Sequence, residues 1–292
     1  MDEKKNIDIE KLAFKSGKIE WAIFNAYSCV GGRTENQDAL AFHMMHHSRY
    51  QVFVVCDGMG GHAGGCVASQ TAVLSLIESF ESQPDETPVI EAVTTAVNEA
   101  NNAVYTKAQN EPSLRGMGTT LTLLVVDKEA AYVTHVGDSR IYQLRNGRKI
   151  FRTVDHSMVF EQVAKGLITE EEARVHPRSN MLSKAMGVLP DIEFTISKLS
   201  YRKEDRFVLC CDGVWNTMPE NELIEMFADE ENLETMVRKT SEIVERIGKK
   251  NGSNHDNHTM IAVDMLCNSD FQTSLFSKVK RLFTTRNQSV SK

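Results

Sequence analysis

Apolar residues occur in short runs along most of the chain, and their spacing changes between that of strands and that of helices. Residues 19–28 and 50–56 are rich in apolar and β-branched side chains, which predicts two strands near the N-terminus. Residues 66–82 and 89–108 carry apolar side chains at helical spacing, which predicts two consecutive helices.

Strand patterns dominate the rest of the chain. They lie at residues 119–126, 130–136, 141–144, 149–154, 192–199, 206–211 and 259–266, and helical patterns lie at 157–174, 219–228 and 231–248. Because strands mostly follow strands, the order favours antiparallel sheets over a doubly wound parallel sheet. We therefore expect an α+β fold, a four-layer α-β-β-α sandwich of two antiparallel sheets flanked by helix pairs.

Composition and charge exclude several classes of protein. The formal net charge of -7 argues against nucleic-acid binding, which usually requires a basic surplus. No apolar run approaches the roughly 18 residues of a membrane span, and the N-terminal residues lack the apolar segment of a signal peptide. We expect a cytoplasmic protein whose six cysteines are reduced. None of them forms Cys-x-x-Cys, so no structural zinc site is expected.

A glycine-rich segment raises the first question of chemistry. Gly58-Met59-Gly60-Gly61-His62-Ala63 matches Gly-x-Gly-x-x-Ala, a dinucleotide-binding pattern, between a predicted strand and a predicted helix. That pattern requires a second parallel strand after the helix, but here another helix follows. The preceding Asp57 would also place a negative charge where a pyrophosphate must bind. We therefore reject the nucleotide-binding interpretation.

Aspartates stand at the ends of several predicted strands: Asp57, Asp138, Asp212 and Asp256. One such aspartate would be explained as a turn residue, but four call for another reason. If they converge, two carboxylates about 4 Å apart repel by roughly 4 kcal/mol at an effective dielectric constant of about 20. Mg²⁺ or Mn²⁺ would relieve this repulsion, since both prefer oxygen ligands. Gly58 would let the backbone approach such an ion.

The motifs as a set resemble the metal-dependent serine/threonine protein phosphatases (type 2C), bacterial branch. The resemblance runs from about residue 22 to 266 and rests on Gly31-Gly-Arg-Thr-Glu-Asn-Gln-Asp38, Asp57-Gly-Met-Gly-Gly-His62, Gly118-Thr-Thr120, Gly137-Asp-Ser-Arg140, Asp212-Gly213 and Asp256-Asn257. Residues 155–187 resemble the flap beside that branch's active site. The family fold is the same α-β-β-α sandwich.

The resemblance implies a set of metal ligands. Asp57 would bridge two Mn²⁺ or Mg²⁺ ions, and the carbonyl of Gly58 would bind one of them. Asp212 and Asp256 would hold the other side of the pair, and Asp38 would lie in the water shell of the metals. A bridging water, with its pKa lowered by the ions, would be the nucleophile.

The resemblance also implies substrate-binding and catalytic residues. Arg33 would bind the substrate phosphate, and His62 would act as general acid toward the leaving oxygen. Asp138 would hold a third, weaker metal. Many family members add an acid four residues after the aspartate at position 212, but this chain has Asn216, so the affinity of the third site is in question.

Two functions remain open on the sequence alone. The first is hydrolysis of phosphoserine and phosphothreonine on proteins, reversing the action of a cognate bacterial serine/threonine kinase. The second is a pseudophosphatase that binds phosphoproteins without turnover, and the presence of Asp57, Asp212 and Asp256 disfavours it. We expect a monomer, with an N-terminal extension at 1–18, the phosphatase domain at 19–267 and a tail at 268–292.

The tail has an unusual charge. Residues 271–292 contain five basic and no acidic side chains, and their apolar residues fall on one face of a helix. A basic amphipathic helix can bind an anionic membrane surface or an acidic partner. The simpler hypothesis, which we favour, is that the apolar face packs on the domain.

Overall fold

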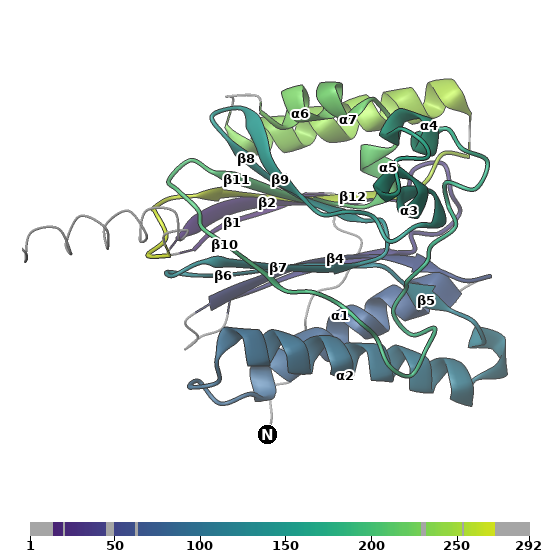
Figure 1. Ribbon diagram of the computed structural model, residues 1–292, viewed down its shortest axis with the longest axis horizontal. Coiled ribbons are helices and arrows are strands. Elements are labelled where there is room, and N and C mark those ends of the chain that lie inside the picture. Colours follow the sequence, from purple (N-terminus) through teal and green to yellow (C-terminus); the bar gives the residue numbers. More distant parts are fainter. Residues whose placement is uncertain are drawn as a thin grey trace, which may run out of the picture.

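The computed structural model describes residues 14–271, apart from 20, 45–49, 62–63, 229–231 and 253. Two β-sheets lie face to face, and helices cover the outer face of each (Figure 1). The predicted four-layer sandwich of antiparallel sheets is confirmed.

The first sheet has six strands in the order β1-β2-β12-β11-β8-β9, with antiparallel neighbours throughout. Its strands are β1 (Lys15–Lys18), β2 (Ala22–Cys29), β12 (His258–Met265), β11 (Arg206–Cys210), β8 (Arg140–Arg145) and β9 (Arg148–Arg152). Its outer face carries α5 (Asp212–Trp215), α6 (Glu220–Phe227) and α7 (Leu233–Asn251). β1 lies within the segment 1–18 that the sequence assigned to an N-terminal extension, yet it pairs with β2.

The second sheet has the order β10-β7-β6-β4-β3, with β5 paired to β4. Its strands are β10 (Ser197–Leu199), β7 (Ala131–Val136), β6 (Leu121–Asp127), β4 (Tyr50–Met59), β3 (Asp38–Met44) and β5 (Gly118–Thr119). α1 (Gly64–Ser82) and α2 (Val89–Asn110) cover it, and the 3-10 helix η1 (Pro112–Leu114) follows.

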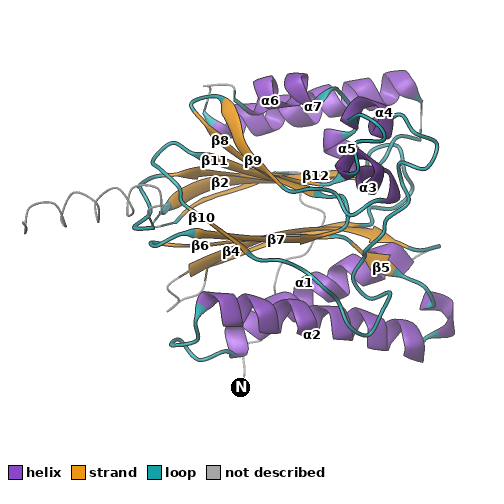
Figure 2. Ribbon diagram, in the orientation of Figure 1, coloured by secondary structure: helices purple, strands orange, loops and turns teal. Residues whose placement is uncertain are grey.

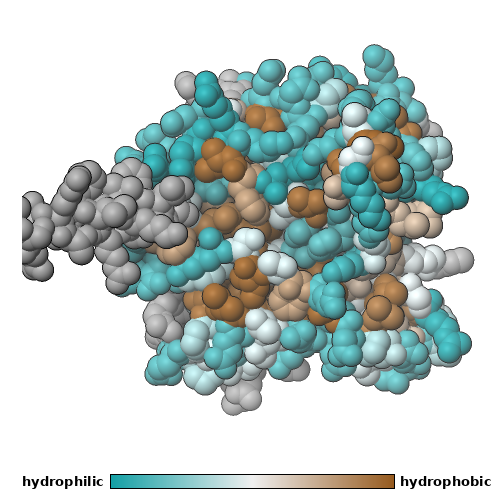
Figure 3. Space-filling model, in the orientation of Figure 1, coloured by the Kyte–Doolittle hydropathy of each residue, from teal (hydrophilic) through white to brown (hydrophobic). Residues whose placement is uncertain are grey.

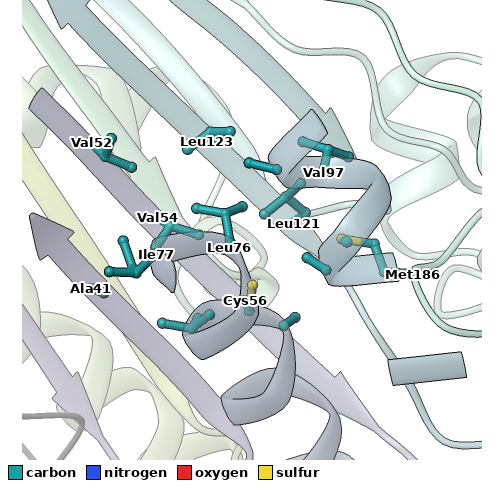
Figure 4. Close-up of a cluster of buried hydrophobic side chains, with 14 of the residues drawn as sticks. Ala41, Val52, Val54, Cys56, Leu76, Ile77, Val97, Leu121, Leu123 and Met186 are labelled. Atoms are coloured by element: carbon teal, nitrogen blue, oxygen red, sulfur yellow. The ribbon is translucent and has the colours of Figure 1, made fainter. Parts of the chain in front are cut away.

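The central strands read as continuous apolar runs because both of their faces are buried. Along β4, Val52 and Val54 pack against α1 and α2, as Figure 4 shows, whereas Phe53 and Val55 pack against the first sheet. This alternation follows from the two-residue period of a strand. Polar residues cover the helical layers of the face in Figure 3, and hydrophobic residues gather mainly between them.

The structure corrects three details of the predicted elements. β3 was not predicted, since its Ala and Asp residues have low strand propensity. Of the strand predicted at 192–199, only β10 forms. The helical pattern at 157–174 divides into α3 (Met158–Ala164) and α4 (Glu170–Arg174). Among the described helices, none is both long and apolar enough to cross a membrane.

Most of the C-terminal tail falls outside the described residues. Its last described residue, Phe271, packs against the cluster between the second sheet and its helices, and Lys198 lies over its ring. The hypothesis of an amphipathic helix over 271–292 therefore stays a prediction.

Candidate active site

The strand topology brings the predicted acids to one edge of the sandwich. β3 begins where β4 ends, so Asp38 is paired directly with Asp57. In the other sheet, Cys210 at the end of β11 is paired with Met260 near the start of β12, which places Asp212 near Asp256. Figure 2 shows loops and the short helices α3, α4 and α5 gathered at this end of the molecule.

A pocket of about 560 Å³ opens at this edge. Among the residues that line it are six of the eight predicted site residues: Arg33, Asp57, Gly58, Asp138, Asp212 and Asp256. His62, the predicted general acid, lies outside the described residues, and its role stays a prediction. The convergence that sequence spacing could only suggest is therefore present in the fold.

Asp38, the remaining predicted residue, lies behind Asp57 rather than on the pocket wall. Its Oδ2 accepts a hydrogen bond from Cys211 Sγ at 3.3 Å, and carboxylate oxygens of Asp38 and Asp57 lie within 4.8 Å of each other and of that sulfur. Asp38 Oδ1 is buried and has no hydrogen-bond partner among the described residues. Sequence analysis missed Cys211, because a cysteine before Asp-Gly reads as part of the buried strand.

The carboxylates raise one another's pKa values. Burial, followed by the charges of Asp212 and Asp256, raises the pKa of Asp38 to about 7. Burial and the charge of Asp256 raise the pKa of Asp212 to about 6. The pKa values of Asp57 and Asp138 are also raised, first by burial and then by neighbouring carboxylates. Cations would remove this mutual repulsion, so the residues present fit the implied divalent metals.

Gly58 is required by packing as well as by the proposed metal contact. A Cβ at this position would lie 1.9 Å from the carbonyl oxygen of Gly65 at the start of α1. The Gly58 N–H donates to the carbonyl of Gln37 at 3.1 Å. A side chain here would separate α1 from β4, so glycine holds the helix against the wall of the pocket.

Hydrogen bonds hold the loops that carry the acids. Thr120 Oγ1 accepts from the backbone N–H of Asp57 at 2.9 Å and lies 2.8 Å from Ser139 Oγ, next to Asp138. Asn257 accepts from the N–H of Gln37 and donates to the carbonyls of residues 30 and 35. The Thr and Asn of the motifs therefore position the acids.

Arg33 follows β2 and reaches the pocket from the side of Asp256. Its guanidinium lies 3.2 Å from Asp256 Oδ2, and its side chain is 44% exposed. A cation at the mouth of an acidic pocket can bind an anionic substrate group from solvent, and its planar fork suits a phosphate.

Known proteins share this architecture. The family model described as protein phosphatase 2C matches residues 27–256, most of the chain. The chain belongs to the protein phosphatase 2C family. It is 32% identical over 237 residues to the serine/threonine phosphatase stp of Listeria innocua, a match that covers 80% of this chain and 88% of that relative.

Solved structures of the family agree with the fold. The serine/threonine phosphatase Stp1 from Staphylococcus aureus superimposes with a TM-score of 0.74 and 27% identity, over 87% of this chain and 97% of that one. The catalytic domain of the serine/threonine protein phosphatase PstP, solved in complex with two manganese ions, gives a TM-score of 0.70 and 29% identity, over 84% and 99% of the two chains.

One buried ion pair in this phosphatase domain has a structural role. Arg140, from the Gly-Asp-Ser-Arg motif, makes two hydrogen bonds of 2.8 and 2.7 Å to the carboxylate of Asp155, and both side chains are buried. The guanidinium also stacks 3.6 Å from the ring centroid of Trp215 on α5. This pair ties β8 to the start of the flap and to the helix that begins at Asp212.

Proposed function

We propose that this chain hydrolyses phosphoserine and phosphothreonine on proteins, using two divalent cations held by Asp57, Asp212, Asp256 and the carbonyl of Gly58. The observation that carries the proposal is the convergence of these groups, with Asp38 behind them, on one pocket. As a family member whose relatives are named serine/threonine phosphatases, the chain is a hydrolase of phosphoproteins. The pseudophosphatase alternative has no support.

The chain's own residues have distinct tasks in this reaction. Bound cations would supply an activated water and stabilise negative charge on the phosphoryl oxygens. Arg33 would bind the substrate phosphate and orient it toward the acids, and His62 would protonate the leaving oxygen. Asp38 would accept a hydrogen bond from a water of the metal shell through its unpaired Oδ1. Mn²⁺ and Mg²⁺ suit these oxygen ligands.

We further propose that the enzyme acts as a cytoplasmic monomer on the substrates of a cognate serine/threonine kinase. All six cysteines are free thiols in the structure, which fits a reducing compartment. The relatives PstP and PhpP are named as protein phosphatases of bacteria, and a phosphatase for phosphoserine and phosphothreonine needs a kinase that makes its substrates.

Removal of the metal tests the proposed function. We expect EDTA to abolish hydrolysis of a small phosphoester, and dialysis into Mn²⁺ or Mg²⁺ to restore it, because the ligands are oxygens. Zn²⁺ should restore it poorly. Initial rates on a phosphoester and a phosphothreonine peptide measure this effect, and activity that survives complete chelation would contradict the proposal.

Asn216 tests the third metal site. It lies one helical turn after Asp212 and lines a smaller pocket of about 200 Å³ beside Asp256. In Asn216→Asp, an added unit charge about 4 Å from a divalent cation contributes roughly 2 kcal/mol in a hydrated pocket, so the half-saturating Mn²⁺ concentration should fall about 30-fold.

The matched control for this substitution is Asn251→Asp, because Asn251 lines the same small pocket from the end of α7. Rates titrated with Mn²⁺ should shift for Asn216→Asp and stay near wild type for the control. Equal shifts in the two variants would show a long-range charge effect in place of direct ligation.

A further inference from the structure

A second cluster of metal-ligating side chains lies on the outer side of the first sheet. Cys29 ends β2 and His258 begins β12, and the two residues are paired across these neighbouring strands. Glu245 approaches them from α7, which packs over β2 and β12 (Figure 1). His255 comes from the loop before β12. The end of β2 therefore meets three consecutive segments of the C-terminal half of the chain at one point.

The side chains of the cluster converge on a single oxygen. Glu245 Oε2 lies 3.0 Å from His258 Nε2, 3.0 Å from His255 Nε2 and 3.9 Å from Cys29 Sγ. The ligand atoms of Cys29, Glu245 and His258 all lie within 4.8 Å of one another. Tetrahedral zinc has bonds of about 2.0–2.3 Å to such atoms, which places its ligands roughly 3.3–3.8 Å apart. The distances from Glu245 Oε2 to His258 and Cys29 differ from this range by only a few tenths of an ångström.

We propose that Cys29, Glu245 and His258 bind a divalent transition metal of the zinc class, with a water in the fourth position and His255 as a hydrogen-bond partner of Glu245. Thiolate, imidazole and carboxylate together favour Zn²⁺ over Mg²⁺ or Ca²⁺, which prefer oxygen alone. The site therefore differs in chemistry from the aspartate pocket, and the two would select different ions from a mixture.

An ion-pair network of Glu245 with its basic neighbours is the simpler alternative. Lys249, however, uses the other oxygen of Glu245, Oε1, at 3.0 Å. Glu245 Oε2 contacts the two imidazoles and the Cys29 thiol. A salt bridge alone would not explain the presence of the thiol.

The surroundings of the cluster suit a metal site. The Tyr27 hydroxyl lies 3.3 Å from His258 Nδ1, which fixes the ring with Nε2 toward the cluster in the manner of an outer-shell partner. His258 is buried, whereas the Glu245 side chain is 26% exposed and leaves a path for the ion. The histidines also flank Asp256 and Asn257, so a bound ion would join α7 to the segment that carries an active-site acid.

Cobalt binding tests the proposal. Wild-type protein in excess Mg²⁺, which occupies the oxygen pocket, should take up one equivalent of Co²⁺ with a thiolate charge-transfer band in the near ultraviolet and intense tetrahedral visible bands. Cys29→Ser should lose the thiolate band, and Cys267→Ser, which removes a cysteine outside the cluster, should keep it. A band that is missing in wild type, or that persists in Cys29→Ser and so reports Cys211, overturns the proposal.

Zinc affinity gives a second readout that does not depend on activity. In competition with a chromophoric chelator, Glu245→Gln should bind Zn²⁺ at least about tenfold more weakly than wild type, since even outer-shell changes cost 10–100-fold. Glu242→Gln, on an exposed position of the same helix, is the matched control. Circular dichroism confirms that each variant is folded. Equal zinc affinity in the folded Glu245→Gln variant and the control would refute the site.

Discussion

Asp57→Asn should lower turnover by about 1,000-fold, equivalent to roughly 4 kcal/mol of activation free energy. Asp57 is proposed to hold both cations, so a neutral amide would weaken the binding of both, and the pocket would lose the activated water and the charge stabilisation that they would supply. Initial rates at saturating Mn²⁺ and isothermal titration of Mn²⁺ measure the effect.

The fold of this variant should remain intact. Burial and the neighbouring carboxylates raise the pKa of Asp57, so the ionised side chain destabilises the metal-free protein. Without metal, Asp57→Asn should therefore melt at or above the wild-type temperature. Asp270→Asn, an exposed position beyond the other end of β12, is the control and should leave turnover unchanged. Near-normal turnover in a folded Asp57→Asn variant would refute the metal assignment.

Asp155→Asn should destabilise the domain by about 3–5 kcal/mol, the range found when one partner of a buried ion pair is removed. The substitution leaves the Arg140 guanidinium buried beside Trp215 with no carboxylate. Urea unfolding at neutral pH, with and without Mg²⁺, measures the free energy of unfolding.

The control for this prediction is an exposed ion pair. Glu234 and Arg238 lie one turn apart on α7, with side chains 56% and 48% exposed, so Glu234→Gln should change stability by at most about 1 kcal/mol. If Asp155→Asn were no more destabilising than this control, the Arg140–Asp155 pair would not be a structural tie between β8 and the flap.

Much of the architecture could be predicted from local pattern. Helical spacing located α1 and α2, and the long apolar runs located β4, β6 and β11, since strands buried on both faces have few polar residues. Asp-Gly pairs after such strands predicted a metal centre, because a carboxylate and an accessible backbone carbonyl are then supplied by two adjacent residues. β3 was not predicted because its strand conformation depends on pairing with β4 more than on the strand propensity of its own residues.

By itself, the sequence determined which acids stand at strand ends and which elements precede them, because hydrophobic period and turn chemistry are properties of neighbouring residues. Only the tertiary structure decided which distant side chains meet: Cys211 against Asp38, Arg140 against Asp155, and Glu245 among Cys29, His255 and His258. These contacts depend on strand order and on the seating of α7 over β2 and β12. No spacing along the chain records them, because pairing across a sheet joins residues at any separation in the sequence.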